Sequence, residues 1–353
     1  MALSRELSND RTMRLMKAAV LYGAQDIRID ERPAPKKPGP ERVTVRVRAV
    51  GLCGSDLSYY QKGGVSAPLQ RPLVLGHEAA GDVVAVGPRV TGVAVGDRVS
   101  IEPGSPCWRC EACRSGQYNL CPLMSFMGSR SGDGALQEYV DWPAGLVHPI
   151  LPTLSYEDAA LVEPVSVAFA AVARARISLG DRVLILGSGA IGLATLQLAR
   201  AAGASFVAVS DMRVRRVALA RQLGADQVID IGSLGEGALP LPDGSIGTVV
   251  DTTGSARAIA QAHDVVKPGG SLVLVGLSHE TLPLSILQLV YRQYAIYGVY
   301  RYSNTFTRVI DLMTDQRIAV APLITHRFPL AEIEAALITA SHGDDAVKVM
   351  IHL

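Results

Sequence analysis

Residues 182–211, RVLILGSGAIGLATLQLARAAGASFVAVSD, decide the fold of this chain. The apolar run at 183–186 predicts a short strand buried on both faces, and the turn at 187–192 has the spacing G-x-G-x-x-G. A helix is expected over 193–202, and a glycine then leads into a second strand that ends at Asp211. This order of strand, glycine turn, helix, strand and acidic residue is typical of a dinucleotide-binding unit.

The glycine turn provides the expected contacts with the cofactor. Gly187 allows the tight turn, Gly189 lets the backbone approach a pyrophosphate, and Gly192 lets the helix pack closely on the strand. Around Ala190 and Ile191, the start of the helix offers free N–H groups and the positive end of its dipole to the phosphates.

The acidic residue at the end of the second strand indicates which cofactor is bound. Asp211 would accept hydrogen bonds from the adenosine ribose hydroxyls and would repel a 2′-phosphate, so it favours NAD over NADP. Arg216 is a further candidate for cofactor binding. Arg213, Arg215 and Arg216 could soften the preference, although a solvated helix face is the simpler interpretation of the three. We expect NAD.

Length and composition narrow the functional class. A chain of 353 residues with 48% hydrophobic and 19% charged residues predicts a well-packed protein of two domains. A net charge of +1 gives no reason to expect nucleic acid or an anionic membrane as a partner. No apolar run reaches the roughly 18–20 residues that a membrane span needs. Residues 1–14 do not resemble a secretory signal, so we expect a flexible extension and a cytoplasmic protein.

The order of elements predicts an α/β fold with two domains. Short strands separated by glycine and proline turns fill residues 15–163 and indicate a β-rich domain. Alternating strands and helices over 164–303 predict a doubly wound parallel sheet, with a helix up to Val266 and a turn at 268–270. Residues 304–353 are expected to rejoin the β-rich domain.

Four of the five cysteines form one cluster in the sequence. The motif C-x2-C-x2-C-x7-C can enclose a tetrahedral zinc ion and leave no open position, which is typical of a structural site. Its members are Cys107, Cys110, Cys113 and Cys121. An iron–sulfur cluster also accepts four thiolates, and disulfides are the remaining alternative, disfavoured in a reducing compartment.

A second, open metal site is suggested by residues that are spread along the chain. Cys53 follows a strand, His77 and Glu78 follow the apolar run 73–75, and Glu163 precedes the nucleotide-binding domain. A thiolate, an imidazole and one or two carboxylates can hold zinc and leave a position for water or substrate. Each residue alone has an ordinary alternative role in the core or in an ion pair.

These motifs together resemble a known family. With Cys-Gly-Ser-Asp at 53–56, Gly-His-Glu at 76–78, the cysteine cluster and the glycine turn in this order, the chain resembles the zinc-dependent medium-chain dehydrogenase/reductase family from about residue 16 onward. It is most similar to the sorbitol/xylitol (polyol) branch, because Glu-Pro-Val-Ser-Val at 163–167 stands where many alcohol dehydrogenases have a cysteine ligand. Segment 298–305 also resembles that branch. The resemblance implies a GroES-like catalytic domain and a Rossmann domain.

The resemblance also implies roles for individual residues. Cys53, His77 and Glu78 are implied as direct zinc ligands, with Glu163 bound directly or through water. Ser55 would begin a proton relay. Family members usually end this relay at a histidine five residues after the cysteine, where this chain has Ser58. The candidate substrate contacts are Tyr59, Glu163, Arg301 and Tyr302.

The expected activity is NAD-linked oxidation of a secondary hydroxyl of a polyol to the ketose, with one catalytic and one structural zinc ion. A sugar-acid dehydrogenase of the L-idonate type or a threonine dehydrogenase is the nearest alternative, with Arg301, Lys62 or Arg71 as cationic contacts. A non-catalytic NAD(P)H-binding protein is the alternative from another class. A homodimer or homotetramer is expected, with the strand 271–276 and the apolar segment 282–290 as the interface.

Overall fold

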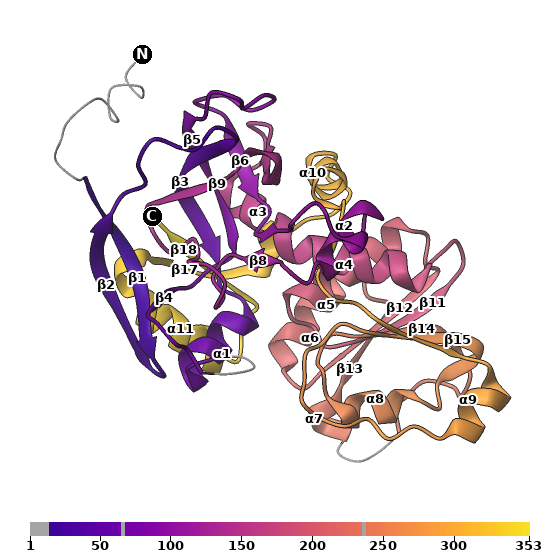
Figure 1. Ribbon diagram of the computed structural model, residues 1–353. Coiled ribbons are helices and arrows are strands. Elements are labelled where there is room, and N and C mark those ends of the chain that lie inside the picture. Colours follow the sequence, from indigo (N-terminus) through magenta and orange to yellow (C-terminus); the bar gives the residue numbers. More distant parts are fainter. Residues whose placement is uncertain (1–13, 65–67, 235–237) are drawn as a thin grey trace. The chain divides into compact units, whose positions relative to one another are not determined.

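A computed structural model describes residues 14–64, 68–234 and 238–353 (Figure 1). The predicted flexible extension 1–14 therefore lies outside the described residues, apart from Arg14. The chain divides into two compact units. The first unit contains the described residues up to Glu163, together with Phe306–Thr314 and Val320–Leu353. The second unit contains Pro164–Thr305 and Asp315–Ala319.

The first unit is built mainly on antiparallel β-structure, with one parallel pair of strands in its largest sheet. Its largest sheet has the strand order β10-β6-β5-β3-β18-β17, and β9 pairs with β3. A second sheet has the order β2-β1-β4, and β7 pairs with β8. The strands are β1 (Leu15–Gly23), β2 (Asp26–Pro33), β3 (Arg42–Gly51), β4 (Leu73–Val74), β5 (Glu78–Val86), β6 (Arg98–Ile101), β7 (Gly104–Ser105), β8 (Ser125–Phe126), β9 (Tyr139–Pro143), β10 (Val147–Pro149), β17 (Ile324–Pro329) and β18 (Lys348–His352).

Strand β3 organises this unit. Its sequence RVTVRVRAVG alternates polar and apolar residues, and its valines are buried in the hydrophobic core. Strands β5, β9 and β18 all pair with it in antiparallel register. The helices of the unit are α1 (Gly54–Lys62), α2 (Glu111–Arg114), α3 (Tyr156–Ala160), α10 (Phe306–Thr314) and α11 (Ile333–His342).

The second unit is a doubly wound parallel sheet, as predicted. Its strand order is β13-β12-β11-β14-β15-β16, so the chain first adds strands on one side of β11 and then on the other side. Helices cover both faces of the sheet (Figure 1). The strands are β11 (Arg182–Leu186), β12 (Phe206–Asp211), β13 (Gln227–Asp230), β14 (Ile246–Asp251), β15 (Val266–Leu274) and β16 (Ala295–Gly298). The helices are α5 (Ala190–Ala201), α6 (Val214–Gln222), α7 (Ile231–Leu234), α8 (Ala256–Ala262) and α9 (Ile286–Arg292), and α4 (Val162–Ala175) leads into the unit from the first.

One local prediction in this sheet is wrong. The helix expected to continue to Val266 ends at Ala262, and β15 already begins at Val266. The expected turn at 268–270 lies within β15, where the register with β14 is irregular between Ile246 and Thr248. A bulge therefore absorbs the proline and glycines that a regular ladder would exclude.

The C-terminal segment is divided differently from the expectation. The sequence predicts that residues 304–353 all belong to the β-rich domain, but 304–305 and 315–319 belong to the second unit. The amide side chain of Gln197 on α5 donates to the carbonyl of Ala319 at 2.9 Å and accepts from its N–H at 2.7 Å. This pair of hydrogen bonds ties the segment to α5. Among the described residues, no helix is both long and apolar enough to cross a membrane.

Candidate active site

Three candidate zinc ligands come together at the ends of two paired strands. Cys53 follows β3 and caps the N-terminus of α1, while Glu78 is the first residue of β5 and His77 precedes it. Because Gly51 on β3 lies opposite Glu78 on β5, the two strand ends are adjacent. One donor atom from each of Cys53, His77 and Glu78 lies within 4.8 Å of the others. The side chains of His77 and Glu78 are buried, so these donors are held in a protected cradle.

A fourth residue, Asp56, connects the loops that carry the ligands. Its Oδ2 accepts a hydrogen bond from the backbone N–H of Cys53, and its Oδ1 accepts one from Gly76, both at 3.0 Å. The carboxylate is fully buried and its Oδ1 lies 3.7 Å from Nδ1 of His77. This role was not predicted from the sequence, although an aspartate three residues after the helix cap is a recognisable capping signal.

The electrostatic environment of His77 is that of a cation site. Burial alone would lower the pKa of His77, but the negative charges of Asp56 and Cys53 raise this pKa well above 6.5. Glu163, which is buried in the first turn of α4, adds to this effect through its charge. Glu163 is not a member of the three-residue group whose donor atoms lie within 4.8 Å.

Glu78 has a buried partner from the far end of the chain. The ammonium group of Lys348 on β18 lies 2.7 Å from each carboxylate oxygen of Glu78 and also donates to the carbonyl of Leu52 at 3.0 Å. Burial would lower the pKa of Lys348, but the charges of Glu78 and Cys53 raise it above its usual value of 10.5. No local sequence signal identified this residue, because the contact depends on the pairing of β18 with β3.

Two glycines pack closely against the backbone that precedes His77. A Cβ atom at Gly134 would lie 2.2 Å from the carbonyl oxygen of Leu75, and one at Gly128 would lie 2.8 Å from that of Gly76. Gly76 itself has a φ of +89°, which favours glycine. Segment 128–134 can therefore back the ligand loop only because these positions lack side chains.

The candidates for the proton relay on α1 are Ser55 and Ser58, and the candidate substrate contact Tyr59 lies on the same helix. Ser55 is partly buried, and the hydroxyl of Ser58 donates to the carbonyl of Gly54 at 3.1 Å. Tyr59 is buried in the hydrophobic core of the unit.

Arg301 and Tyr302 belong to the second unit, where Tyr302 is buried and the Arg301 guanidinium lies over the ring of Tyr300.

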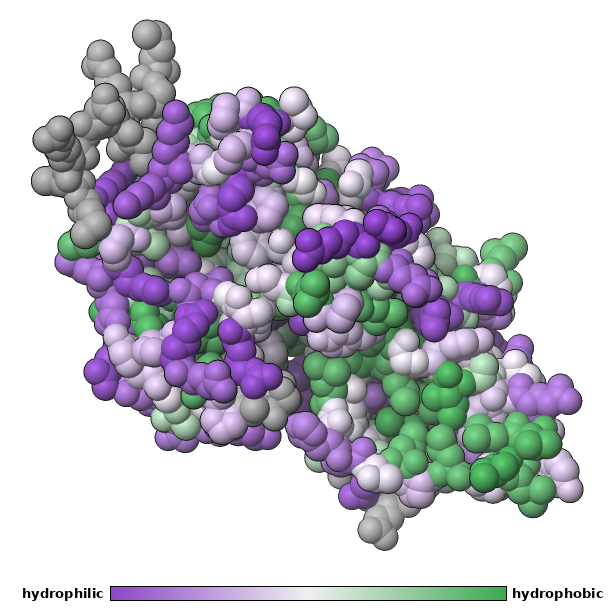
Figure 2. Space-filling view, viewed as in Figure 1, coloured by the Kyte–Doolittle hydropathy of each residue, from purple (hydrophilic) through white to green (hydrophobic). Residues whose placement is uncertain are grey.

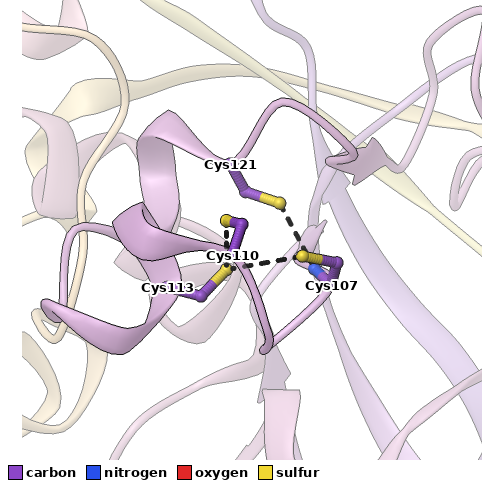
Figure 3. Close-up of side chains that lie close together, drawn as sticks. All are labelled: Cys107, Cys110, Cys113 and Cys121. Atoms are coloured by element: carbon purple, nitrogen blue, oxygen red, sulfur yellow. Dashed lines mark hydrogen bonds between the residues drawn. The ribbon is translucent and has the colours of Figure 1, made fainter.

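The four-cysteine cluster forms a small lobe of its own (Figure 3). The four sulfur atoms all lie within 4.8 Å of one another. These four cysteines and Cys53 are free thiols, so none of them forms a disulfide. The backbone N–H groups of Arg109 and Cys110 lower the pKa of Cys107 to about 6, whereas burial raises that of Cys113 to about 12. Four convergent sulfurs fit a closed, structural zinc site.

A buried glutamate attaches this lobe to the sheet. Glu102 accepts hydrogen bonds at Oε1 from the Tyr118 hydroxyl at 2.7 Å, and Oε2 lies 2.9 Å from Nε2 of His148. Its backbone carbonyl accepts from the indole of Trp142 at 2.8 Å. Tyr118 lies between the third and fourth cysteines, so Glu102 connects the cysteine lobe to β9 and β10. No sequence motif distinguishes Glu102.

The glycine turn in the second unit has the geometry of a cofactor loop. Gly187 has a φ of +96°, Gly189 caps α5, and a Cβ at Gly192 would lie 1.9 Å from the carbonyl oxygen of Gly187. Asp211 accepts hydrogen bonds at Oδ2 from the N–H and the hydroxyl of Ser188, at 2.7 and 2.8 Å. The Asp211 carboxylate is therefore held against the glycine turn.

Arg216 contributes positive charge close to Asp211. Burial lowers the pKa of its guanidinium, and the charge of Arg213 lowers it further, while Asp211 acts in the opposite direction. The adenosine end of the expected cofactor site thus contains both an acidic and a basic group.

Comparison with known proteins identifies the class. Residues 39–152 match the alcohol dehydrogenase GroES-like domain, and residues 190–315 match the zinc-binding dehydrogenase family. The chain is 38% identical to the sorbitol dehydrogenase of Gallus gallus over 340 residues, covering 95% of each chain. It is 37% identical to that of Bacillus subtilis, covering 96% of this chain and 97% of the other. The crystal structure of galactitol-1-phosphate dehydrogenase from Escherichia coli matches with a TM-score of 0.86 and 28% identity, covering 96% of this chain and all of that one (100%).

The chain therefore belongs to the zinc-binding alcohol dehydrogenase family, as the sequence resemblance indicated. It is an NAD-linked oxidoreductase with a catalytic and a structural zinc site. The residues present fit these groups: a partly buried thiolate with a buried imidazole and carboxylate suits an open zinc site, and four sulfurs suit a closed one.

Proposed function

We propose that the protein oxidises a secondary hydroxyl of a polyol of the sorbitol, xylitol or galactitol type to the ketose. The substrate carbon loses a hydride to NAD+ and the hydroxyl loses its proton, which gives ketose, NADH and H+. The observation that carries this proposal is the convergence of the partly buried Cys53 with the buried His77 and Glu78, together with Glu163 in a Glu-Pro-Val-Ser-Val motif. Near-full-length similarity to two sorbitol dehydrogenases supports the substrate class.

Different residues of the first unit bind the zinc and carry the proton away. Cys53, His77 and Glu78 would hold the catalytic zinc, which when bound supplies the Lewis acidity that lowers the pKa of the substrate hydroxyl. Ser55 begins the path by which the proton leaves. The Ser58 hydroxyl donates its hydrogen to the carbonyl of Gly54, so the hydroxyl must rotate before it can pass a proton further along that path.

Substrate and cofactor are oriented by further residues. Tyr59, Glu163, Arg301 and Tyr302 are the proposed contacts with neighbouring hydroxyls of the polyol. Tyr59 is buried in the hydrophobic core of the first unit, so packing fixes the position of its ring. For the cofactor, the glycine turn at 187–192 holds the pyrophosphate, Asp211 and Arg216 hold the adenosine ribose, and the Asp211 carboxylate favours NAD.

A homodimer formed through the second unit is part of the proposal. Helix α9 exposes four large apolar side chains, Ile286, Leu287, Val290 and Tyr291, with exposed fractions of 78%, 59%, 62% and 78%. Figure 2 shows apolar surface gathered over this helix. Residues 271–274 of the expected interface strand 271–276 lie in β15, which is paired with β14 on one side and with β16 on the other and therefore cannot supply the edge. Strand β16 is the last strand of its sheet, so its outer edge can pair with the same edge of a second copy.

Light scattering tests the dimer. The protein is expected to have twice the chain mass, and Val290→Glu is expected to reduce it to the monomer mass. A tetramer that Val290→Glu splits into dimers also supports this interface. A monomeric parent protein, or a mass unchanged by the substitution, contradicts it.

The free thiols and the metal-binding lobe support a reducing, cytoplasmic location, which fractionation of the source cells would test.

Substrate assays test the proposed reaction. NADH formation is followed with sorbitol, xylitol, galactitol, altritol, L-idonate and threonine in parallel, before and after zinc is removed by a chelator and then restored. Zinc-dependent activity on a polyol supports the proposal. Preference for L-idonate or threonine replaces the substrate class, and activity that survives complete zinc removal overturns the mechanism. Tight NADH binding without turnover and without a catalytic zinc indicates a binding protein.

A further inference from the structure

Lys348 is a buried cation whose hydrogen-bonding capacity is fully used by the catalytic site. Its exposed fraction is 5%, and its ammonium group contacts both oxygens of Glu78 at 2.7 Å and the carbonyl of Leu52 at 3.0 Å. An ammonium group has three donors, so this arrangement leaves none for other partners. Lys348 thus connects the segment that leads to Cys53 with the side chain of Glu78.

The strand pairing explains how this contact crosses the sheet. Gly51 on β3 lies between Met350 on β18 and Glu78 on β5. A Cβ atom at Gly51 would lie 2.2 Å from Oε2 of Glu78, so the carboxylate occupies the space that a side chain would fill. The absence of that side chain lets Glu78 extend across β3 toward Lys348.

This geometry puts Lys348 in competition with a metal ion for Glu78. Both oxygens of the carboxylate already accept a charged hydrogen bond, so a zinc ion in the same site must share this ligand with the ammonium group. Lys348 is also the positive charge that balances part of the negative charge of Cys53, Glu78 and Glu163. A carboxylate that is shared in this way gives less of its charge to the metal.

We propose that Lys348 is a positioning residue that restrains Glu78. In this way it reduces the negative charge that the Glu78 carboxylate provides to the catalytic zinc. The inference rests on the zinc site of the proposed function and extends it, because it assigns the control of metal affinity to a residue outside the ligand set. It does not depend on which alcohol is oxidised.

Zinc release from the fully loaded protein tests this proposal. Release of zinc to a chromogenic chelator is measured for the parent protein, Lys348→Met and Lys348→Arg, with the zinc of the cysteine lobe as the internal standard. Without the ammonium charge, we expect Lys348→Met to hold the catalytic zinc about tenfold or more tightly, because unit charges a few ångströms apart interact strongly at the dielectric constant of a protein. Lys348→Arg, which retains the charge, should stay close to the parent.

A spectroscopic measurement separates this role from simple structural support. With cobalt in place of the catalytic zinc, the absorption bands of Lys348→Met should shift, since Glu78 then binds the metal more fully, and those of Lys348→Arg should not. Faster zinc loss from Lys348→Met, or unchanged zinc release and an unchanged cobalt spectrum, overturns the proposal. If Lys348→Met does not fold, Lys348→Gln, which keeps a donor without the charge, carries the same expectations.

These readouts are independent of the proposed substrate. An enzyme that proves inactive toward polyols but shows the expected zinc retention and cobalt spectra would overturn the proposed reaction and support the role of Lys348. Activity on a polyol with zinc retention unaffected by Lys348→Met would do the reverse.

Discussion

Gly76 donates a hydrogen bond of 3.0 Å from its backbone N–H to Oδ1 of Asp56, although the two residues are 20 positions apart in the chain. The other carboxylate oxygen, Oδ2, accepts from the N–H of Cys53, also at 3.0 Å. One buried carboxylate therefore fixes the backbone on both sides of the zinc site. The geometry of the ligands depends on a residue that is not itself a member of the ligand group.

Replacing Asp56 by asparagine should empty the catalytic zinc site. An amide presents one acceptor oxygen instead of two, so one of the buried N–H groups loses its partner, at a cost of about 1–3 kcal/mol. We expect the zinc content to fall from two ions per chain toward one, with the cysteine lobe still loaded. Elemental analysis after dialysis measures this, and a variant that retains both ions with unchanged thermal stability contradicts the role of Asp56.

Replacing Cys53 by alanine should abolish turnover while leaving NADH binding largely intact. The thiolate is one of three donors within 4.8 Å of one another, and the glycine turn that binds the cofactor belongs to the other unit. Steady-state assays measure the loss of activity, and quenching of protein fluorescence by NADH measures binding. If NADH binding is lost together with activity, Cys53 has a structural role instead.

Replacing Asp211 by asparagine should weaken the preference for NAD. The carboxylate charge that would repel a 2′-phosphate is removed, while one amide oxygen can still accept from Ser188. We expect the ratio of kcat/KM for NADP+ to that for NAD+ to rise by about tenfold, which corresponds to roughly 1.4 kcal/mol. Ser188→Ala is the matched control, because it removes the hydroxyl contact and leaves the charge. A shift of similar size in the control would assign the preference to the loop.

Local patterns were sufficient to predict the parts of the site that lie within one segment. The strand, glycine turn, helix and second strand at 182–211 form β11, α5 and β12, with the reversal of strand order at β11. The cysteine motif predicted a compact lobe, because its four ligands lie within fifteen residues of sequence. In both cases the spacing of a few residues determines the geometry.

Contacts that depend on strand pairing could not be predicted in this way. Lys348 reaches Glu78 only because β18 pairs with β3, and nothing in the sequence Val-Lys-Val-Met-Ile distinguishes this lysine from a surface residue. Glu102 is buried for a similar reason, since its partners come from β9, β10 and the cysteine lobe. The early start of β15 was missed because a bulge accommodates residues that normally end a strand.

Replacing Tyr118 by phenylalanine should loosen the cysteine lobe. The substitution removes the 2.7 Å hydrogen bond to the buried Glu102 carboxylate, and we expect a loss of about 1–3 kcal/mol in the stability of the attachment. Zinc of the lobe should be released to a chelator faster, with the catalytic zinc unaffected. Tyr60→Phe is the matched control, because its hydroxyl also donates to a glutamate, Glu334, outside the lobe. Equal release rates for both variants would exclude a special role for Tyr118.

The acid sensitivity of the first unit should depend on Glu157, which lies on α3. Its carboxylate accepts hydrogen bonds from the Arg327 guanidinium at 2.7 and 2.9 Å and lies 2.7 Å from Nε2 of His352. These contacts connect α3 to β17 and β18. The hydrogen bonds from Arg327 hold the pKa of Glu157 below its usual value of 4.5, with burial acting in the opposite direction and His352 adding to the lowering.

Because the pKa of Glu157 is lower in the folded state than in the unfolded state, its stabilising contribution is complete above about pH 4.5 and is lost as the pH falls through the folded-state value. Glu157→Gln should therefore reduce stability by about 0.5–1 kcal/mol near neutral pH, as expected for a partly exposed pair. Thermal unfolding of both proteins from pH 7 to pH 3 measures this. The difference between their melting temperatures should shrink below pH 4.5, and a difference that persists unchanged at pH 3 would show that the carboxylate charge is not its source.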